Sequence, residues 1–534
     1  MTERKGPEAG LVEPGEEGWP GTGADAAAST TAGSLLRGGA WNTTSRLVPQ
    51  LYVLAISIAG ARFLGAEQFG QQSFIAFVEL SLILFLSGGL SITATRFVGD
   101  VLGRRQPAAV ASLVRWIWRV EAIAAVTGGS VLVIAAAAGA DPESAWVLAG
   151  VACTLGILHA APSALLIGSQ RWRAASIVGL VTGAASTVAI ILVLAAGGGI
   201  TGMFAVEAAV AAVNVLWTTL LARRALSEVA PAAREPLADA AWRVLRRDLW
   251  RYAIPTSYGV LLTIVVWRRS EFFFLEYYST DTQIALYSVV FAVVAALTQL
   301  PDAIAAITLP AVATLSGAGQ AERIRTGFSR ALRLVLFATL PVTAVAFALG
   351  PALLRVVYGP EFEDTGSVLL IMLLPFPLLP LVSLSRSVLA GLGRLRVPLL
   401  IETAAAVLNI ALAFLLVSGH GAEGAAVANV AAQAMGAVLV LAYSLTAVGA
   451  PQWRPLSLWR AAIAAAAAGL AGWAGVSLLP DAPGLAVGLV AAAVVFAGLA
   501  VALRILPRED AIWLDEHAGE RLGGLVGAFC RRCS

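Results

Sequence analysis

The stretch Leu166-Ile-Gly-Ser-Gln-Arg-Trp-Arg173 has a counterpart in the second half of the chain, Leu389-Ala-Gly-Leu-Gly-Arg-Leu-Arg396. Both fit the pattern L-x-G-x-x-R-x-R, and both lie between two long apolar runs. A second pair has nearly the same offset and joins Gly199-Ile-Thr-Gly202 to Gly421-Ala-Glu-Gly424. A weaker third pair, FGQQSFIAFV and IALYSVVFAV, has a slightly smaller offset. Three pairs in the same order predict a duplicated unit.

The composition is that of a membrane protein. Hydrophobic residues make up 58% of the 534 residues and charged residues only 13%, whereas a soluble domain carries about 25% charge. Apolar runs of roughly 17–25 residues, long enough to span a bilayer, recur about fourteen times. Because lipid offers no partners to backbone groups, each run is expected to be a helix. The sequence predicts an all-α multi-pass membrane protein with about fourteen transmembrane helices.

Arginines mark one side of the membrane. They occur in the loops after even-numbered predicted helices, including Arg104, Arg171, Arg323, Arg394 and Arg454. The loops after odd-numbered helices, such as GAEQFG, ADPES and GPEFED, contain none. Since basic loops stay in the cytoplasm, both termini and all basic loops are predicted to be cytoplasmic.

The repeat and the charge pattern together predict the domain organisation. Each copy has six helices, an even number, so the copies share one orientation and are related by an axis along the membrane normal. The predicted parts are a disordered cytoplasmic tail (1–33), an N-lobe (34–225), a cytoplasmic linker (226–250), a C-lobe (251–450), two further helices (451–506) and a cytoplasmic tail with an amphipathic helix (507–534).

Several short motifs resemble the polysaccharide flippases of the multidrug/oligosaccharidyl-lipid/polysaccharide exporter superfamily. Ala61-Arg-Phe-Leu-Gly65, followed by Phe69-Gly70, is similar to the turn after their first helix. Tyr252-Ala-Ile-Pro255 and Tyr358-Gly-Pro-Glu-Phe362 follow in the expected order, and the resemblance covers about residues 35–450. It implies two six-helix lobes around a central cavity and two extra helices at the end.

The resemblance also implies a function. A bacterial plasma-membrane transporter would flip a polyprenyl-pyrophosphate-linked oligosaccharide for cell-envelope polysaccharide synthesis by alternating access. Its partners would be membrane lipids, a polysaccharide polymerase and glycosyltransferases. The alternatives are a flippase of the peptidoglycan lipid precursor and a small-molecule or multidrug exporter of the same superfamily. A glycan polymerase and a non-transporting scaffold are the remaining alternatives.

No enzymatic motif occurs in the chain. A P-loop and a G-x-S-x-G motif are both absent, which argues against an enzyme and against nucleotide use. The single C-x-x-C, Cys530 to Cys533, lacks the second pair or the neighbouring histidines that a zinc site needs. No nucleic-acid partner, cofactor or metal is expected, apart from a coupling Na⁺ or H⁺.

Arginines inside the predicted spans are the substrate candidates, because charges there are costly and need a wet cavity or a partner. The resemblance implies a pyrophosphate, which arginine binds in bidentate fashion. The candidates are Arg46, Arg268, Arg269 and Arg386, with Gln50 one turn beyond Arg46. Snorkelling to the headgroups is the alternative for Arg46 and Arg386.

Carboxylates inside the spans are the ion-coupling candidates: Glu79, Glu207, Glu271 and Asp302. Pairing with an arginine is the alternative for each. Glu271 stands where many members of the superfamily resembled place an aspartate. Here it follows Arg268 and Arg269, and pairing between Arg268 and Glu271 at i,i+3 would neutralise one arginine.

Overall fold

The structure, a computed structural model, describes residues 32–104, 106–229, 237–267, 270–449, 455–517 and 532–533. Within those ranges the chain is helical and contains no strand. The helices are α2 (Ala32–Ile83), π-helical η1 (Leu84–Gly88), α3 (Gly89–Gly103), α4 (Pro107–Ala137), α5 (Glu143–Gly168), α6 (Trp172–Ala195), α7 (Gly199–Val229), α8 (Asp239–Trp267), α9 (Phe272–Tyr278), α10 (Asp281–Gly317), α11 (Ala321–Tyr358), 3₁₀-helical η2 (Pro360–Phe362), α12 (Thr365–Leu373), α13 (Leu379–Gly391), α14 (Arg396–Val448), α15 (Pro455–Leu478), α16 (Asp481–Ala502) and α17 (Arg508–His517).

The predicted number of spans is confirmed. Eleven continuous helical stretches in the described ranges are long and apolar enough to cross a membrane. Two of them bend at glycines with positive φ, Gly65 (76°) and Gly421 (49°), so each contains two crossing segments. The broken pair α12 and α13 adds one more, which makes fourteen. A positive φ at these corners favours glycine, because a side chain would be strained there.

The repeat predicted from L-x-G-x-x-R-x-R extends to the hydrogen bonds of the two turns. After α5, the N–H groups of Ser169, Gln170 and Arg171 donate to the carbonyls of Leu165, Ile167 and Leu166 at 3.0, 3.0 and 2.8 Å. After α13, the equivalent bonds, each displaced by the same offset as the two motifs, have the same three lengths. The fifth residue of each motif is left-handed: Gln170 has φ 63° and Gly393 has φ 71°.

The arginines of these turns bind to the ends of other helices. Arg171 forms an ion pair with Glu228 near the end of α7, and Arg394 donates to the Ala447 carbonyl near the end of α14 at 3.4 Å. A cation near a helix C-terminus is stabilised by the helix dipole. The two turns therefore have a structural role, as their place between spans suggests.

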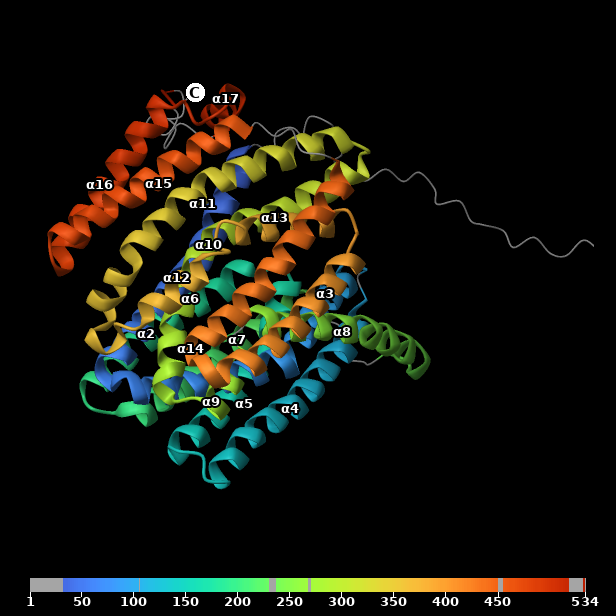
Figure 1. The fold of residues 1–534 in the computed structure, drawn as a ribbon. Coiled ribbons are helices and arrows are strands. Elements are labelled where there is room, and N and C mark those ends of the chain that lie inside the picture. The colour runs from blue at the N-terminus through green and yellow to red at the C-terminus, as the bar shows by residue number, and fades with distance from the viewer. Residues whose placement is uncertain are drawn as a thin grey trace, which may run out of the picture.

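The last helices form a separate layer. Helices α15 and α16 pack against one another and along α11 at one edge of the bundle, while α4 lies at the opposite edge (Figure 1).

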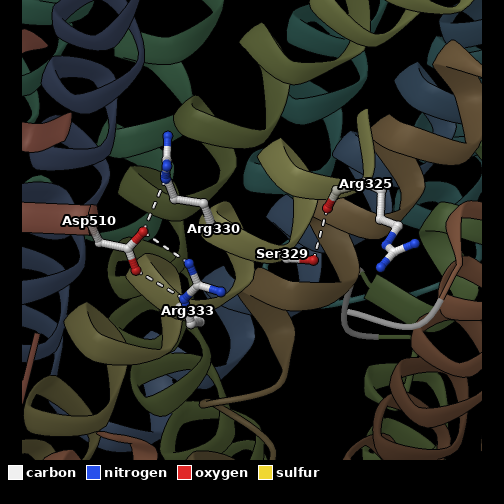
Figure 2. A network of polar contacts seen from close by, with 5 residues as sticks. All are labelled: Arg325, Ser329, Arg330, Arg333 and Asp510. Carbon is white, nitrogen blue, oxygen red and sulfur yellow. Dashed lines mark hydrogen bonds and ion pairs between the residues drawn. The ribbon is translucent and has the colours of Figure 1, made fainter. Parts of the chain in front are cut away.

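Helix α17 packs onto the beginning of α11, where Arg333 holds the fully buried carboxylate of Asp510 with two hydrogen bonds of 2.9 Å (Figure 2). Arg330 adds a third bond of 3.0 Å. A helix, α17, is present at the beginning of the predicted tail, and it docks on the protein. The rest of the C-terminal tail prediction, and almost all of the N-terminal one, lies outside the described residues.

Helix α8 joins the two halves of the protein. Its first half packs through Trp242, Leu245 and Leu249 against α3, α4 and α5, whereas Leu262 and Val266 of its second half pack against α14. Helices α7 and α8 also extend into the predicted linker 226–250. That segment therefore contains the C-terminal end of α7 and the N-terminal part of α8, because its Ala- and Leu-rich sequence favours helix.

The halves meet tightly at the end of the bundle that carries the arginine-free loops. Arg62 donates to the Val357 carbonyl at 2.8 Å, and the Ala66 N–H donates to Glu361 at 2.9 Å. A Cβ on Gly70 would lie 1.8 Å from the carbonyl oxygen of Asp281, so only glycine permits this approach of α2 to α10. The bundle is thus closed at the end that the charge pattern predicts to be outside.

Candidate functional site

A polar cavity of about 350 Å³ lies inside the N-lobe. It is lined by α2, α5, α6 and α7, whose lining residues recur every three or four positions, so that one face of each helix points inward. The polar lining residues are Glu79, His159, Ser163, Thr182, Ser186, Glu207, Asn214 and Thr218. We call this space the N-lobe cavity.

Two predicted ion-coupling residues meet in the N-lobe cavity. Glu79, on the second half of α2, is 5% exposed, and Glu207 extends from α7. Both carboxylate residues line this one cavity, and the buried Oε2 atom of Glu79 has no hydrogen-bond partner among the described residues. Buried polar atoms are normally paired, so an unpaired carboxylate oxygen facing a cavity is suited to bind a cation or a proton.

Four of the other polar residues of the cavity form two pairs. His159 Nε2 lies 3.2 Å from the Thr218 hydroxyl, and the Thr182 hydroxyl lies 2.8 Å from Asn214 Oδ1. Asn214 therefore makes the bond between helices that is usual for polar residues in spans. His159, Thr182 and Thr218 were not among the residues predicted from the sequence. The signal was present, since Glu207, Asn214 and Thr218 recur at helical spacing on one face of α7.

A second polar cluster lies in the C-lobe, where the seventh span is broken between α8 and α9. Glu271 is fully buried there. The Tyr287 hydroxyl donates to its Oε2 at 3.1 Å, and Asn429 Nδ2 donates to its Oε1 at 2.8 Å. Gln433 in turn donates to Asn429 Oδ1 at 2.7 Å. We call Glu271, Tyr287, Asn409, Asn429 and Gln433 the C-lobe network.

The C-lobe network also satisfies the broken helix. Asn409 Nδ2 donates to the Val265 carbonyl at 2.9 Å and lies 3.2 Å from the Ser270 hydroxyl. Non-helical backbone at membrane depth persists only where such partners exist. The Asn409 Oδ1 atom is buried and has no partner among the described residues, which leaves one unpaired oxygen in the C-lobe network.

The structure describes few of the side chains of the remaining predicted site residues. Arg268 and Arg269 lie outside the described residues, so pairing between Arg268 and Glu271 is untested. Arg46 and Asp302 lie on α2 and α10, but their side chains are also outside the described part. Gln50 is half-buried on α2.

Arg386 has an acidic partner. Its guanidinium lies 2.8 Å from Glu402 and links α13 to α14. The side chains are 30% and 17% exposed, so the pair is partly shielded from solvent. A paired arginine can still bind a phosphate, but it must then share its charge with Glu402. Its role as a substrate ligand stays a prediction.

The arrangement of the helices places the chain in a class of multi-pass helical membrane folds whose solved examples include transporters. A solved structure described as the inward-facing conformation of a multidrug resistance MATE family transporter of the MOP superfamily matches with a TM-score of 0.65. It is 16% identical, and the match covers 76% of this chain and 98% of that one. A MOP superfamily transporter from Pyrococcus furiosus matches with a TM-score of 0.50 and 15% identity, over 78% of this chain and 96% of that one.

The more particular similarity is to the lipid II flippase MurJ. A MurJ structure in an inward closed conformation matches with a TM-score of 0.66 and 12% identity, over 90% of this chain and 100% of that one. The family model described as lipid II flippase MurJ matches residues 283–494. The comparison with curated proteins gives no match. The structural similarities are at low identity and establish a shared fold.

These comparisons refine the resemblance to polysaccharide flippases. The superfamily fold that the resemblance implied is present, with MurJ and MATE transporters as structural neighbours. A polysaccharide flippase subfamily is not specifically indicated, because the matching family model is that of the lipid II flippase.

Proposed function

We propose that the protein flips a polyprenyl-linked peptidoglycan precursor across the bacterial plasma membrane. The observation that carries the proposal is the match of residues 283–494 to the lipid II flippase model, together with the fold shared over 90% of the chain. The proposal replaces a surface-polysaccharide precursor, the main expectation from the sequence, with the alternative.

The precursor's pyrophosphate needs cationic partners in a space between the lobes. We propose Arg46, Arg268, Arg269 and Arg386 for this role, with Gln50 as a neutral donor. The polyprenyl chain would stay in the lipid, and the headgroup would cross through water-filled space. No covalent step is needed, since the transported molecule is unchanged.

Two places are suited to couple transport to an ion. The N-lobe cavity offers Glu79 and Glu207, and the C-lobe network offers Glu271 with the free oxygen of Asn409. The described residues contain no cluster of three or more His, Cys, Asp or Glu side chains that could hold a metal. A site with one or two carboxylates and neutral oxygens fits Na⁺ or H⁺, which are the ions we propose. Asp302 is a further candidate on α10.

Reconstitution tests the proposal directly. The purified chain would be placed in vesicles with fluorescent lipid II on the inner leaflet, and the fraction reaching the outer leaflet would be measured with a membrane-impermeant quencher. We expect lipid II to flip faster than a polyprenyl-pyrophosphate-linked oligosaccharide without a peptide. The opposite order would favour the polysaccharide role, and flipping of neither would contradict both.

A small-molecule exporter is the second candidate, because one observation favours it. The described residues that line the N-lobe cavity include two glutamates and no arginine, a lining that suits a cation. Efflux of a fluorescent lipophilic cation from the same vesicles, without lipid II flipping, would support this function.

A further inference from the structure

A pocket outside the proposed transport route lies between α4 and the first half of α8. It has a volume of about 410 Å³. Three arginines and three tryptophans line it: Arg115, Arg119, Arg246, Trp116, Trp242 and Trp250. Ser112, Leu237 and Asp239 complete the lining. We call it the Arg–Trp pocket.

The pocket is built by contacts between segments far apart in the sequence. The Leu237 N–H donates to the buried Ser112 hydroxyl at 2.9 Å, which fixes the beginning of the α8 segment on α4. The rings of Trp116 and Trp250 meet edge to face, with centroids 5.5 Å apart. These contacts hold the arginines of α4 and α8 around one space.

The described residues that line the pocket carry a net positive charge. Among the described residues, none of Arg115, Arg119 and Arg246 forms an ion pair. One carboxylate, that of Asp239, lines the pocket against the three guanidinium groups. Planar guanidinium groups bind phosphate oxygens in pairs, so the pocket suits a phosphate monoanion or dianion.

The surface beside the pocket is apolar and points to an amphiphile. Arg115, Arg119, Ile123 and Val126 follow one another at intervals of one helical turn, which places them on one stripe of α4. Ile123 is 70% exposed and Val126 65% exposed. A stripe that begins with arginines and continues with exposed apolar side chains matches a lipid, with its phosphate in the pocket and its acyl chains along α4.

The location of the pocket agrees with a lipid of the cytoplasmic leaflet. It lies at the end of the bundle with the basic loops, and tryptophans and arginines gather at that interface of membrane proteins. Basic pockets between transmembrane helices on this side bind anionic headgroups. We propose that the Arg–Trp pocket binds the phosphate headgroup of an anionic membrane phospholipid.

The bound lipid would have a mechanical consequence. Helix α8 packs on the N-lobe with its first half and on α14 with its second half, and the pocket closes between α4 and that first half. A headgroup held by Arg115 and Arg246 ties α8 to α4. Transport is therefore expected to depend on anionic phospholipid even when its substrate is present.

Native mass spectrometry of the purified full chain in detergent tests the proposal. Phosphatidylglycerol and phosphatidylcholine are titrated separately, and the affinity of the first retained lipid is measured. We expect phosphatidylglycerol to bind more tightly. Arg246→Gln should weaken it about fivefold and Arg115→Gln/Arg246→Gln about thirtyfold, since each arginine near the surface contributes about 1 kcal/mol.

Control variants on α8 distinguish binding in the pocket from a general effect of positive charge. Arg247→Gln and the double variant Arg243→Gln/Arg247→Gln remove the same charges from α8 residues outside the pocket lining. They should leave phosphatidylglycerol affinity nearly unchanged. An equal loss in these controls, or equal retention of phosphatidylcholine, would overturn the proposal.

Competition with inorganic phosphate completes the test. A lipid site predicts that phosphate does not displace phosphatidylglycerol at equal concentration, because the apolar stripe on α4 also holds the acyl chains. Displacement would identify a free-anion site and overturn the lipid proposal. Tighter retention of polyprenyl phosphate than of phosphatidylglycerol would assign the pocket to the transported lipid and overturn it as well.

Discussion

Glu79 and Glu271 differ in how much of their hydrogen-bonding capacity the protein uses. Both oxygens of Glu271 accept bonds, from Tyr287 and Asn429. The Oε2 atom of Glu79 has no partner among the described residues, and Glu207 brings a second carboxylate to the same cavity. A buried unsatisfied group costs about 1–3 kcal/mol, so the N-lobe pair gains most from binding a cation or a proton.

The N-lobe carboxylates are expected to carry the ion dependence of transport. Glu79→Gln and Glu207→Gln keep the volume and remove the charge. Each should lower ion-driven flipping about tenfold or more, because a bond to a charged group contributes about 1.5–3 kcal/mol. The measurement is flipping in vesicles with and without Na⁺ or pH gradients. Glu143→Gln, at an exposed site on α5, is the control and should keep the wild-type ion dependence.

The C-lobe network is expected to stabilise the broken span. Tyr287→Phe removes a buried donor to Glu271 and should lower the free energy of unfolding by about 1–3 kcal/mol. Thermal unfolding in detergent measures the change. Tyr258→Phe removes a hydroxyl that lies 3.0 Å from Thr403 at an exposed site, and it should shift the midpoint far less. Equal shifts for both variants would contradict a special role of the network.

At the scale of the elements, the position of α17 depends on ion pairs between its buried Asp510 and two arginines of α11. Its buried Asp510 is held by Arg330 and Arg333 of α11 (Figure 2). The Leu506 N–H just before the helix donates to the Cys533 carbonyl at 3.1 Å. Two arginines around one carboxylate already carry a net positive charge, and this charge increases if the acid is neutralised. The buried carboxylate of Asp510 is therefore expected to matter more for the position of α17 than for the stability of the helix bundle.

Asp510→Asn should release α17 from α11. Breaking a buried ion pair by removing one partner costs about 3–5 kcal/mol, which exceeds what a ten-residue helix gains alone. Limited proteolysis should cut the variant near residue 510 much faster than the wild type. The control Glu322→Gln removes an exposed acid that lies 3.6 Å from Arg325 on α11, and about 0–1 kcal/mol is expected there. Unchanged cleavage of Asp510→Asn would show that apolar packing alone holds α17.

At the scale of the whole molecule, the two halves come into contact where a glycine permits a close approach of their helices. Gly70 of α2 approaches Asp281 of α10, and Tyr358 of α11 reaches the Ser57 hydroxyl at 3.3 Å across the same interface. If the proposed flippase works by alternating access, this interface must open and close. The described structure has the interface closed, so a variant that disturbs its packing should expose it.

Gly70→Ala should hold this interface apart. The added Cβ would overlap the backbone of Asp281, which cannot rotate away, and overpacking of this kind costs about 1–3 kcal/mol. Labelling of Ser57→Cys by a membrane-impermeant thiol reagent, in a background without the natural cysteines, should rise in the variant. Gly259→Ala, where a Cβ meets no atom within 4 Å, is the control. No increase in labelling would mean that the helices shift without opening.

Much of the fold could be predicted because its signals are local. The length of an apolar run and the placement of arginines depend on near neighbours, so the fourteen segments follow from the sequence. The repeat followed from the two L-x-G-x-x-R-x-R turns, whose hydrogen bonds proved equivalent at the same offset. The break between α8 and α9 was missed, because its partners Asn409 and Asn429 are distant in sequence.

The sequence by itself determined the fold class, the number of spans and the pairing of the repeats, because hydrophobicity and helical period act within one segment. Only the tertiary structure decided which polar groups meet. It brings Glu79 to Glu207 in one cavity, Glu271 to Asn429 across 158 positions, and Arg333 to Asp510 across 177. Such meetings depend on how whole helices cross and bend, and no short stretch of residues contains that information.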